Sequence, residues 1–300
     1  MADKLNAGKL TADKLTAGKA SDSFSDVCIA ISFRGRDHYR IRNLQRVVQH
    51  YAALLDIEII LVEQDSKPCA LPNLGDAVKR LFVHNPGSFN KSWGFNIAVR
   101  QSNRALMVLM DADALIELSA LAQAIKLTRT RTFATNPFDA WQDLTLPETE
   151  DVLTQASVDF KATRGSTQRR EREQLNFCGG AFVIRREFYL QLGGFDERFL
   201  GWGGEDDHME IKLKRSGQPV GKVQGSTGLH LWHPQSQATT FDQPHYASNL
   251  KLVQELAACD PAQFKFLCEL QRQLAGHPRK YELATHDPLH GYFEPRSETV

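Results

Sequence analysis

Two acidic clusters contain the residues of this sequence whose types and spacing could do chemistry. In the first, Asp111 and Asp113 flank Ala112 and directly follow the apolar run 105–110. Carboxylates at the end of a buried strand in a parallel sheet face the crevice where ligands bind. Such oxygens can hold a hard divalent cation that neutralises a diphosphate. For an isolated pair of this kind, a solvated turn is the alternative.

The second cluster joins an aromatic residue between glycines to three consecutive acids. It consists of Gly201, Trp202, Gly203, Gly204, Glu205, Asp206 and Asp207. Glycines let the backbone approach a ligand closely, and a helix dipole favours ionised acids in the first turn. An ionised carboxylate in a sugar pocket can accept a hydroxyl proton as a general base. An ordinary helix start explains one or two acids, but not the aromatic residue between glycines.

Two histidines, His230 and His233, lie downstream of the acids. Either could complete an oxygen-rich metal site, and an imidazole ligand would move the preference from Mg²⁺ toward Mn²⁺. The alternative for either histidine is an ordinary core or surface residue.

Basic and aromatic residues stand at two further predicted element ends. Phe33, Arg34 and Arg36 end the first predicted strand, and Phe89 and Lys91 begin a predicted helix. Arginine at the mouth of the crevice suits a diphosphate, phenylalanine could line a base pocket, and a helix N-terminus could face phosphates. Charged surface loops are the alternative at both places.

The elements that must position these residues alternate between strand and helix. Strands are predicted at 27–33, 57–63, 80–84, 105–110, 177–184 and 218–223. Helices are predicted at 37–55, 89–100, 119–127, a short one from 186, one from about 205 to 215, and 246–274. This alternation predicts an α/β fold, with a mostly parallel sheet and helices on both faces. Residues 136–175 are polar and irregular, and are interpreted as a variable excursion.

The chain of 300 residues can form one large α/β domain. We expect a tail at 1–24 that contains a decapeptide repeat, the main domain at 25–240, and a helical extension at 241–300. The part after Gly276 is expected to be loose. Cys28 and Cys178 lie in apolar runs and are expected in the core.

Composition excludes several classes of function. Lys plus Arg equals Asp plus Glu at 36 each, so net charge gives no general attraction to nucleic acid. Five cysteines without close pairing argue against a disulfide framework or a zinc knuckle. No apolar run reaches the length of a membrane span, and the N-terminus has no hydrophobic signal core. A cytoplasmic location is expected, and peripheral association with the inner face of a membrane stays open.

The motifs recur together in one order that resembles the β-1,4-galactosyltransferase superfamily and its bacterial relatives, including chondroitin-polymerase-type family-2 glycosyltransferases. The resemblance covers about residues 27–235 and rests on the stretches 33–36, 89–91, 111–113, 177–181, 193–196 and 201–207. It implies a single GT-A domain, a UDP-sugar donor, a saccharide acceptor, and inversion of the anomeric centre. It also implies Mn²⁺ as the cofactor, with Mg²⁺ as the alternative.

The resemblance further implies a role for each motif residue. The donor-binding residues would be Phe33, Arg34, Arg36, Phe89, Lys91, Asp111, Ala112 and Trp202. The acceptor-binding residues would be Trp202, Gly203, Glu205 and Asp207. The metal ligands would be Asp113, His233 and His230, the last at a position where the animal enzymes have Met. Asp206 would be the catalytic base.

Three departures qualify the resemblance. Gly35 stands in place of the usual Asn, and Lys91 in place of an Arg. The family's disulfides are missing from the pattern, which suits a bacterial cytosolic relative. Asp206 stands where retaining N-acetylgalactosaminyltransferases usually have Asn, which favours inversion.

The sequence thus predicts a transferase that moves a galactose- or N-acetylgalactosamine-type sugar from UDP to a saccharide hydroxyl, as in polysaccharide biosynthesis. Residues 136–175 are expected to select the acceptor. One alternative is a metal-dependent phosphohydrolase that uses Asp111, Asp113 and the two histidines. The other is a non-catalytic nucleotide-sugar-binding module.

Overall fold

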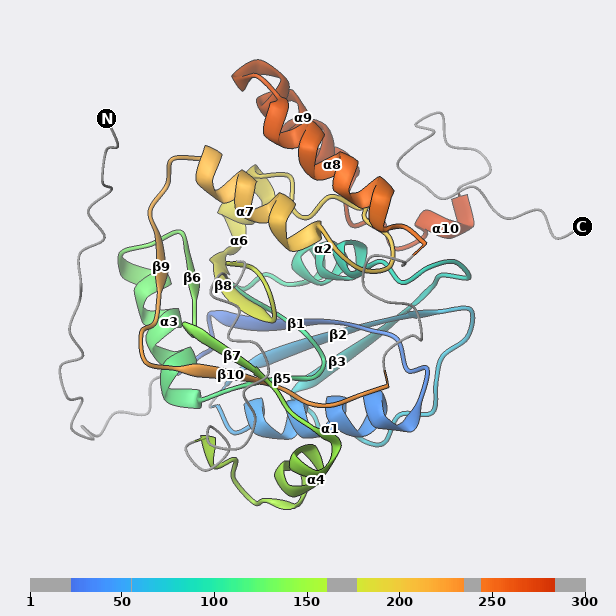
Figure 1. Ribbon diagram of the computed structural model, residues 1–300, viewed down its shortest axis with the longest axis vertical. Helices are drawn as coiled ribbons and strands as arrows, with labels where there is room; N and C mark the ends of the chain where they lie inside the picture. The colour runs from blue at the N-terminus through green and yellow to red at the C-terminus, as the bar shows by residue number, and fades with distance from the viewer. Residues whose placement is uncertain (1–22, 55, 161–176, 235–243, 284–300) are drawn as a thin grey trace, which may run out of the picture.

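A computed structural model describes residues 23–54, 56–160, 177–234 and 244–283. Its centre is a seven-stranded sheet with the order β3-β2-β1-β4-β8-β6-β9 (Figure 1). The strands are β3 (Val78–His84), β2 (Glu58–Asp65), β1 (Val27–Phe33), β4 (Leu106–Met110), β8 (Ala181–Arg185), β6 (Ala134–Asn136) and β9 (Val220–Lys222). Strand β8 runs antiparallel to β4 and β6, whereas the other neighbours pair in parallel. The predicted α/β class with a mostly parallel sheet is confirmed.

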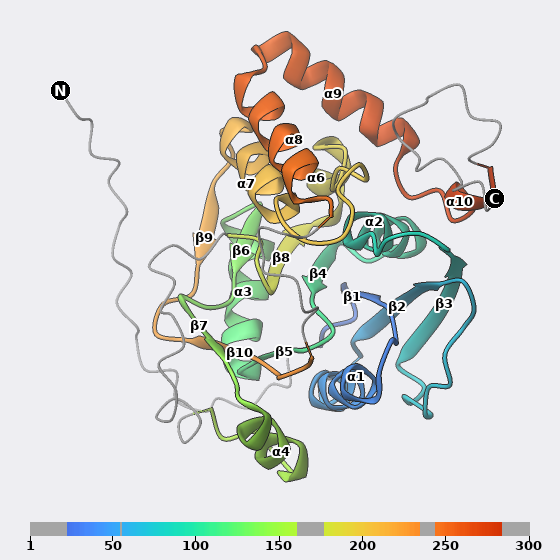
Figure 2. The same ribbon diagram turned by 45° about the vertical axis from the view of Figure 1, so that its right-hand side comes forward.

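Helices cover both faces of this sheet. The helices of the described chain are α1 (His38–Tyr51), α2 (Lys91–Gln101), α3 (Leu118–Thr130), α4 (Leu146–Thr154), α6 (Arg186–Gln191), α7 (Glu205–Arg215), α8 (Tyr246–Ala258), α9 (Pro261–Leu274) and α10 (Lys280–Leu283). Alternate residues of β1 serve the two faces: Ile29 and Ile31 pack with α1 and α3, and Cys28 and Ala30 pack with α2 and α7. In Figure 2, α8 and α9 lie beyond α7, on the side of the sheet away from α1.

A second, three-stranded sheet lies next to the end of β4. It consists of β5 (Ala114–Ile116), β10 (Thr227–His230) and β7 (Ala140–Asp143). Strand β10 runs antiparallel to β5 and parallel to β7. Strand β5 begins at the residue after Asp113 and pairs with β10. The small sheet therefore places the first acidic cluster beside β10.

Helix α7 begins at a backbone conformation that requires glycine. Gly204 caps the helix with φ 91°, in the left-handed region. A Cβ added there would lie 2.9 Å from the Phe199 ring. The glycines before the three acids therefore serve a turn that places the start of α7.

Several sequence predictions of irregular structure were wrong. Residues 136–160 are not an irregular excursion, because they contain β7 and α4, which has a capping box formed by Thr145 and Glu148. Strand β8 begins at Ala181 rather than at 177, and β10 was missed. The predicted helical region 246–274 is two helices, separated where Asp260 caps α9.

The C-terminal segment is also more ordered than predicted. Lys280 and Tyr281 of α10 are buried, so the chain after Gly276 is not loose as far as residue 283. Cys28 and Cys178 are buried, as predicted. The repeat within 1–22 and residues 161–176 and 284–300 lie outside the described residues. Among the described residues, no helix combines the length and apolar character needed to cross a membrane.

Candidate functional site

The structure brings the three predicted metal ligands together. One ligand atom each of Asp113, His230 and His233 lies within 4.8 Å of the others. His230 Nε2 is 3.5 Å from Asp113 Oδ1, and His233 Nε2 is 3.3 Å from Asp113 Oδ2. A mixed set of one carboxylate and two imidazoles fits a first-row divalent ion such as Mn²⁺ better than Mg²⁺, which prefers oxygen ligands.

The small sheet explains this convergence. His230 pairs with Ala114 of β5, and the Leu231 N–H donates to the Asp113 carbonyl at 2.8 Å. The segment that leads to His233 is fixed from two other elements. Asn43 of α1 donates to the Trp232 carbonyl at 3.0 Å, and the Trp232 N–H donates to Thr149 Oγ1 of α4 at 2.8 Å.

Each histidine has a second polar neighbour that the sequence did not predict. Asp143 Oδ1 is 2.9 Å from His230 Nδ1, and Arg40 Nη2 is 3.1 Å from His233 Nδ1. A single acid in a polar stretch and one arginine on a surface helix carry no local signal, because only strand pairing and helix packing bring them to the histidines.

Charge coupling dominates this cluster. Burial lowers the pKa of His230, but the carboxylates of Asp113 and Asp143 outweigh it and raise that pKa to about 10. Burial likewise favours neutral Asp113, yet His230 and His233 hold its pKa well below its usual value. A divalent cation that binds here replaces a proton on the imidazole.

The second cluster is held by one lysine. Lys91 Nζ lies 3.2 Å from Asp111 Oδ1, 3.5 Å from Glu205 Oε1 and 3.3 Å from Asp206 Oδ2. Lys91 is the first residue of α2, Asp111 follows β4, and the other two acids begin α7. The ammonium group therefore joins the two predicted acidic clusters into one site, and Asp207 lies half-buried one residue further along α7.

Burial perturbs the acids of this second cluster. It raises the pKa of Asp206 well above the usual value; the Lys91 charge opposes this, while Glu205 and Asp111 add to it. Burial lowers the pKa of Lys91, but the three carboxylates together raise it well above its usual value. Lys91 therefore stays charged, and Asp206 binds a proton more readily than an exposed aspartate does.

The loop before α7 presents an aromatic platform. The Trp202 side chain is 44% exposed, and its ring stacks on Tyr246 with centroids 5.9 Å apart. Asn249 Nδ2 donates to the carbonyls of Leu200 at 3.0 Å and Gly203 at 2.9 Å. Tyr246 and Asn249 belong to α8, so the C-terminal extension holds this loop, and no local pattern in the sequence predicts that.

The predicted donor residues divide into exposed and internal ones. Arg36 is exposed and Phe89 is half-buried. Arg34 is buried; its Nε donates to the Gln64 carbonyl at 2.8 Å and its Nη2 to the Asn85 carbonyl at 3.0 Å. Phe33 is 2% exposed and packs in the core. In this structure Phe33 and Arg34 brace the β1 end, and the donor contacts expected for them stay predictions.

Ala112, between the two acids, packs against the core on the α1 side of the sheet. Its side chain therefore anchors the turn that carries Asp111 and Asp113. The donor contact expected for Ala112 also stays a prediction.

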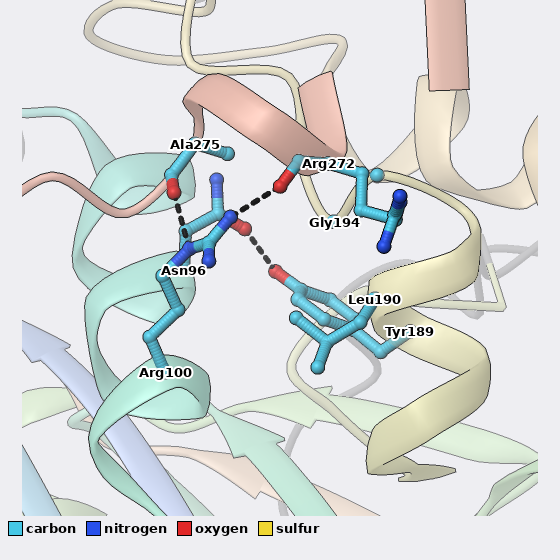
Figure 3. Close-up of a pocket in the computed structure, with 8 residues that line it drawn as sticks. Asn96, Arg100, Tyr189, Leu190, Gly194, Arg272 and Ala275 are labelled. Atoms are coloured by element: carbon cyan, nitrogen blue, oxygen red, sulfur yellow. Dashed lines mark hydrogen bonds between the residues drawn. The ribbon is translucent and has the colours of Figure 1, made fainter. Parts of the chain in front are cut away.

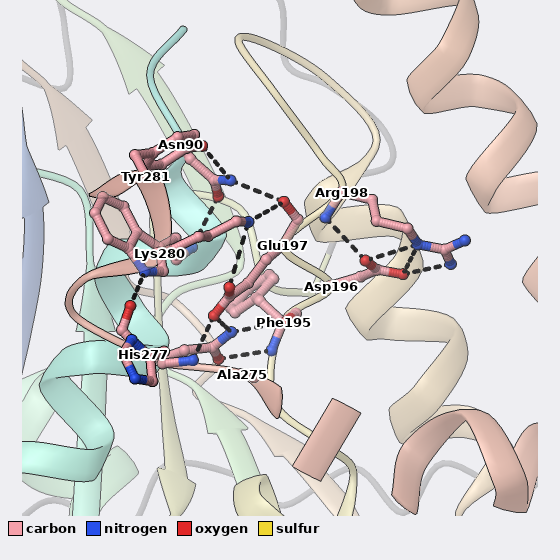
Figure 4. Close-up of polar contacts among 12 residues, drawn as sticks. Asn90, Phe195, Asp196, Glu197, Arg198, Ala275, His277, Lys280 and Tyr281 are labelled. Carbon is pink, nitrogen blue, oxygen red and sulfur yellow. Dashed lines mark hydrogen bonds and ion pairs between the residues drawn. The ribbon is translucent and has the colours of Figure 1, made fainter. Parts of the chain in front are cut away.

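Asp196 at the end of the motif 193–196, and Glu197 directly after it, belong to a polar network that supports the site. Asn90, the N-cap of α2, donates to the Glu197 carbonyl at 2.8 Å, and Lys280 Nζ lies 3.4 Å from Glu197 Oε2 (Figure 4). The neighbouring Asp196 pairs with Arg198 at 2.7 Å. This polar network ties the C-terminal segment to the start of α2, where Lys91 lies.

A small hollow lies toward the other end of α2 and contains no predicted site residue. Arg100 donates to the carbonyls of Ala275 and Arg272, and Tyr189 donates to Asn96 Oδ1 at 2.6 Å (Figure 3). These bonds fasten α6, α9 and the 275–276 turn to α2. The hydrogen bonds that line this hollow therefore stabilise α2, the helix that positions Lys91.

Comparison with known proteins identifies the segment that carries the second cluster. The family model described as "N-terminal domain of galactosyltransferase" matches residues 164–234, which include Trp202, the three acids and both histidines. This segment of the chain is therefore similar to that domain of galactosyltransferases. The matched part ends one residue after His233, so it contains two of the three predicted metal ligands.

Individual relatives match over short stretches. The chain is 37% identical to β-1,4-galactosyltransferase 7 of Drosophila melanogaster over 49 residues, which is 16% of this chain and 15% of the relative. It is 33% identical to chondroitin synthase of Escherichia coli over 64 residues, 21% of this chain and 9% of that protein. The matches thus span a minor part of each relative's length.

A solved structure is similar over a longer part of the chain. It is the catalytic domain of Drosophila β1,4-galactosyltransferase 7 in complex with xylobiose, with a TM-score of 0.49 and 15% identity. The superposition covers 76% of this chain and 79% of that one.

Proposed function

We propose that this chain is a metal-dependent glycosyltransferase that moves a sugar from a UDP-sugar to a saccharide hydroxyl with inversion. Kinship with galactosyltransferases favours a galactose- or N-acetylgalactosamine-type donor. One observation carries the proposal: Lys91 pairs with both Asp111 and Asp206. The Asp111–Asp113 turn and the acids of α7 therefore border one space, as a single displacement between donor and acceptor requires.

The proposed donor side is the end of β4. A divalent cation held by Asp113, His230 and His233 would neutralise the diphosphate and stabilise the departing UDP. Asp111 then faces the donor ribose or sugar. Arg36 is exposed close to the end of β1, so its guanidinium group can approach the phosphates and donate charge-assisted hydrogen bonds to them.

The proposed acceptor side is the start of α7 and the loop before it. The exposed ring of Trp202 offers an apolar face for a sugar, and Glu205 and Asp207 accept hydrogen bonds from acceptor hydroxyls. Asp206 accepts the proton of the attacking hydroxyl, whose oxygen bonds to the anomeric carbon as the bond to UDP breaks. Its raised pKa makes it a stronger base once it is ionised.

We further propose that residues 25–240 form the catalytic domain and that residues 241–300 extend it. Tyr246 and Asn249 of the extension contact the Trp202 loop, which supports a role for the extension in holding the acceptor side of the site.

The base assignment is tested with Asp206→Asn, which keeps shape and hydrogen bonding but removes the ionisable carboxylate. We expect transfer to fall on the order of a hundred- to ten-thousand-fold, because that is the usual contribution of a general base. Donor binding, measured as a UDP-dependent shift in unfolding temperature with Mn²⁺, should stay near wild type. The assay is a panel of UDP-sugars with saccharide acceptors, and NMR of the product reports the anomeric configuration.

Asp207→Asn is the matched control, because it changes the next acid of the same helix. Asp207→Asn should raise the KM for the acceptor by a larger factor than it lowers kcat. Near-normal turnover of Asp206→Asn would contradict the base assignment. Phosphate release from simple phosphoesters without an acceptor would instead favour a phosphohydrolase.

A further inference from the structure

The side chain of Asp143 lies against the far nitrogen of a candidate metal ligand. The β7–β10 pairing is parallel and places Asp143 directly beside His230. In this register Asp143 Oδ1 is 2.9 Å from His230 Nδ1, while His230 Nε2 is directed at Asp113, 3.5 Å away. One edge of the imidazole therefore contacts Asp143, and the opposite edge faces the other ligands.

The plane of the same imidazole is also restrained. The Trp141 ring stacks on His230 with centroids 6.1 Å apart and an interplanar angle of 27°. Two glycines leave room for this indole, since a Cβ at Gly180 or at Gly228 would lie 2.4 Å from its ring atoms. Trp141 and Asp143 thus come from the same strand and hold one ring by its face and by its edge.

We propose that Asp143 is a positioning residue that prepares His230 to ligate the divalent cation. A carboxylate that accepts from Nδ1–H fixes the proton on that nitrogen and leaves the Nε2 lone pair for the metal. The carboxylate also increases the basicity of the ligating nitrogen and restrains rotation of the ring. Asp143 itself does not touch the metal or the reacting atoms.

The second histidine has a different arrangement, which makes His230 the ligand that depends on a carboxylate. His233 Nδ1 lies 3.1 Å from the Pro234 carbonyl and 3.1 Å from Arg40 Nη2. A carbonyl beside an arginine adds no negative charge to that ring. Loss of Asp143 therefore removes the carboxylate support from one ligand and leaves the other unchanged.

This inference rests on the proposed function, because it concerns the metal site that the function uses. The test is direct titration of the full chain with Mn²⁺, without donor or acceptor, by EPR of free Mn²⁺ and by calorimetry. For Asp143→Ala we expect Mn²⁺ affinity to fall about tenfold, the lower end of the range for such partners, because the Asp143 side chain is 42% exposed. Asp143→Asn keeps an acceptor for Nδ1–H and should lose less.

Asp139→Asn is the matched control. Asp139 is an exposed acid just before β7 whose carboxylate accepts from the Gly225 N–H, away from the histidines. This variant should bind Mn²⁺ like wild type. Unfolding temperatures without metal should stay close together for Asp143→Ala and Asp139→Asn, whereas the increase caused by Mn²⁺ should be smaller for Asp143→Ala.

The outcomes separate this inference from the proposed function. Equal Mn²⁺ affinity in wild type and Asp143→Ala overturns the positioning role, while sugar transfer that depends on Mn²⁺ and Asp206 still supports the function. Lower metal-free unfolding temperature of Asp143→Ala with unchanged Mn²⁺ affinity means a purely structural residue and also overturns the inference. Wild-type protein that binds no Mn²⁺ at millimolar concentration overturns both.

Discussion

The metal cluster and the acid cluster around Lys91 both adjoin the end of β4, yet they neutralise their carboxylates differently. Asp113 faces two imidazoles, which carry positive charge only while protonated. Asp111, Glu205 and Asp206 share one lysine, whose pKa their charges raise well above its usual value. The first cluster can exchange its protons for a metal cation, whereas the second already contains a fixed cation.

This difference assigns the two clusters to different tasks. Imidazole nitrogens become metal ligands when they lose a proton, but an ammonium group has no lone pair to offer. A divalent cation is therefore expected at Asp113, His230 and His233, and not among the three acids that Lys91 holds. The acids of α7 remain available for hydrogen bonds and proton transfer with an acceptor.

The largest expected effect comes from removing the carboxylate of the metal cluster. Asp113→Ala leaves two imidazoles without their shared anion, so we expect Mn²⁺ binding to be lost and transfer to fall by more than about a hundredfold. Mn²⁺ titration and initial rates measure this. Asp111→Asn is the control, because it lies two residues away in the Lys91 cluster and should retain Mn²⁺ binding. If both substitutions weaken Mn²⁺ equally, the division between the clusters is wrong.

A smaller effect is expected from removing the fixed cation. The charge of Lys91 lowers the pKa of Asp206 against the raising effect of burial, so Lys91→Met should raise that pKa further. A base works only when ionised, and activity rises as pH increases through its pKa. The acidic limb of the pH–rate profile should therefore move to higher pH, with about a tenfold loss of rate at neutral pH.

Lys91→Arg is the matched control for the pH profile, since it retains the charge and should leave the limb near its wild-type position. A limb that moves to lower pH in Lys91→Met would contradict the assigned electrostatics. Mn²⁺ affinity should change little in either variant, because Lys91 pairs with Asp111, Glu205 and Asp206, which lie outside the metal cluster.

The sequence predicted the elements that are either nearly all apolar or strongly periodic. Strands β1, β2 and β4 are runs of buried residues, and α1 has a clear apolar face, so each was found within a few residues of its bounds. The missed strands, β5, β6, β7 and β10, are only three or four residues long, too short for a clear alternation of apolar and polar residues. Helix α4 did carry a readable signal, the Thr145–Glu148 capping box.

The site was predictable where its chemistry is contiguous in the chain. The Asp111–Asp113 turn and the 201–207 cluster were found because acids and glycines stand side by side. Asp143 and Asn249 act across 87 and 46 residues, on His230 and the Gly203 carbonyl, so no local pattern marks them. Phe33 is 2% exposed and packs in the core at the end of β1, so its expected contact with the donor stays a prediction.

The smallest effect is expected from loosening the loop that presents Trp202. Asn249 is 2% exposed, and its amide donates to the carbonyls of Leu200 and Gly203. Asn249→Ala leaves these carbonyls without that donor, at a cost of about 1–3 kcal/mol that is concentrated in the loop. Because the loop leads directly into the acids of α7, the acceptor KM should rise severalfold, while Mn²⁺ affinity and the donor KM stay within about twofold.

The matched control for Asn249→Ala is Ser248→Ala, one residue earlier in α8. Its exposed hydroxyl donates to the His245 carbonyl rather than to the Trp202 loop. The prediction is tested by measuring the acceptor KM, the donor KM and the Mn²⁺ affinity of both variants. A loss of Mn²⁺ affinity in Asn249→Ala would mean that the metal cluster depends on the packing of α8. The two clusters would then act as one mechanical unit, and the separation of tasks inferred from their charges would not extend to their rigidity.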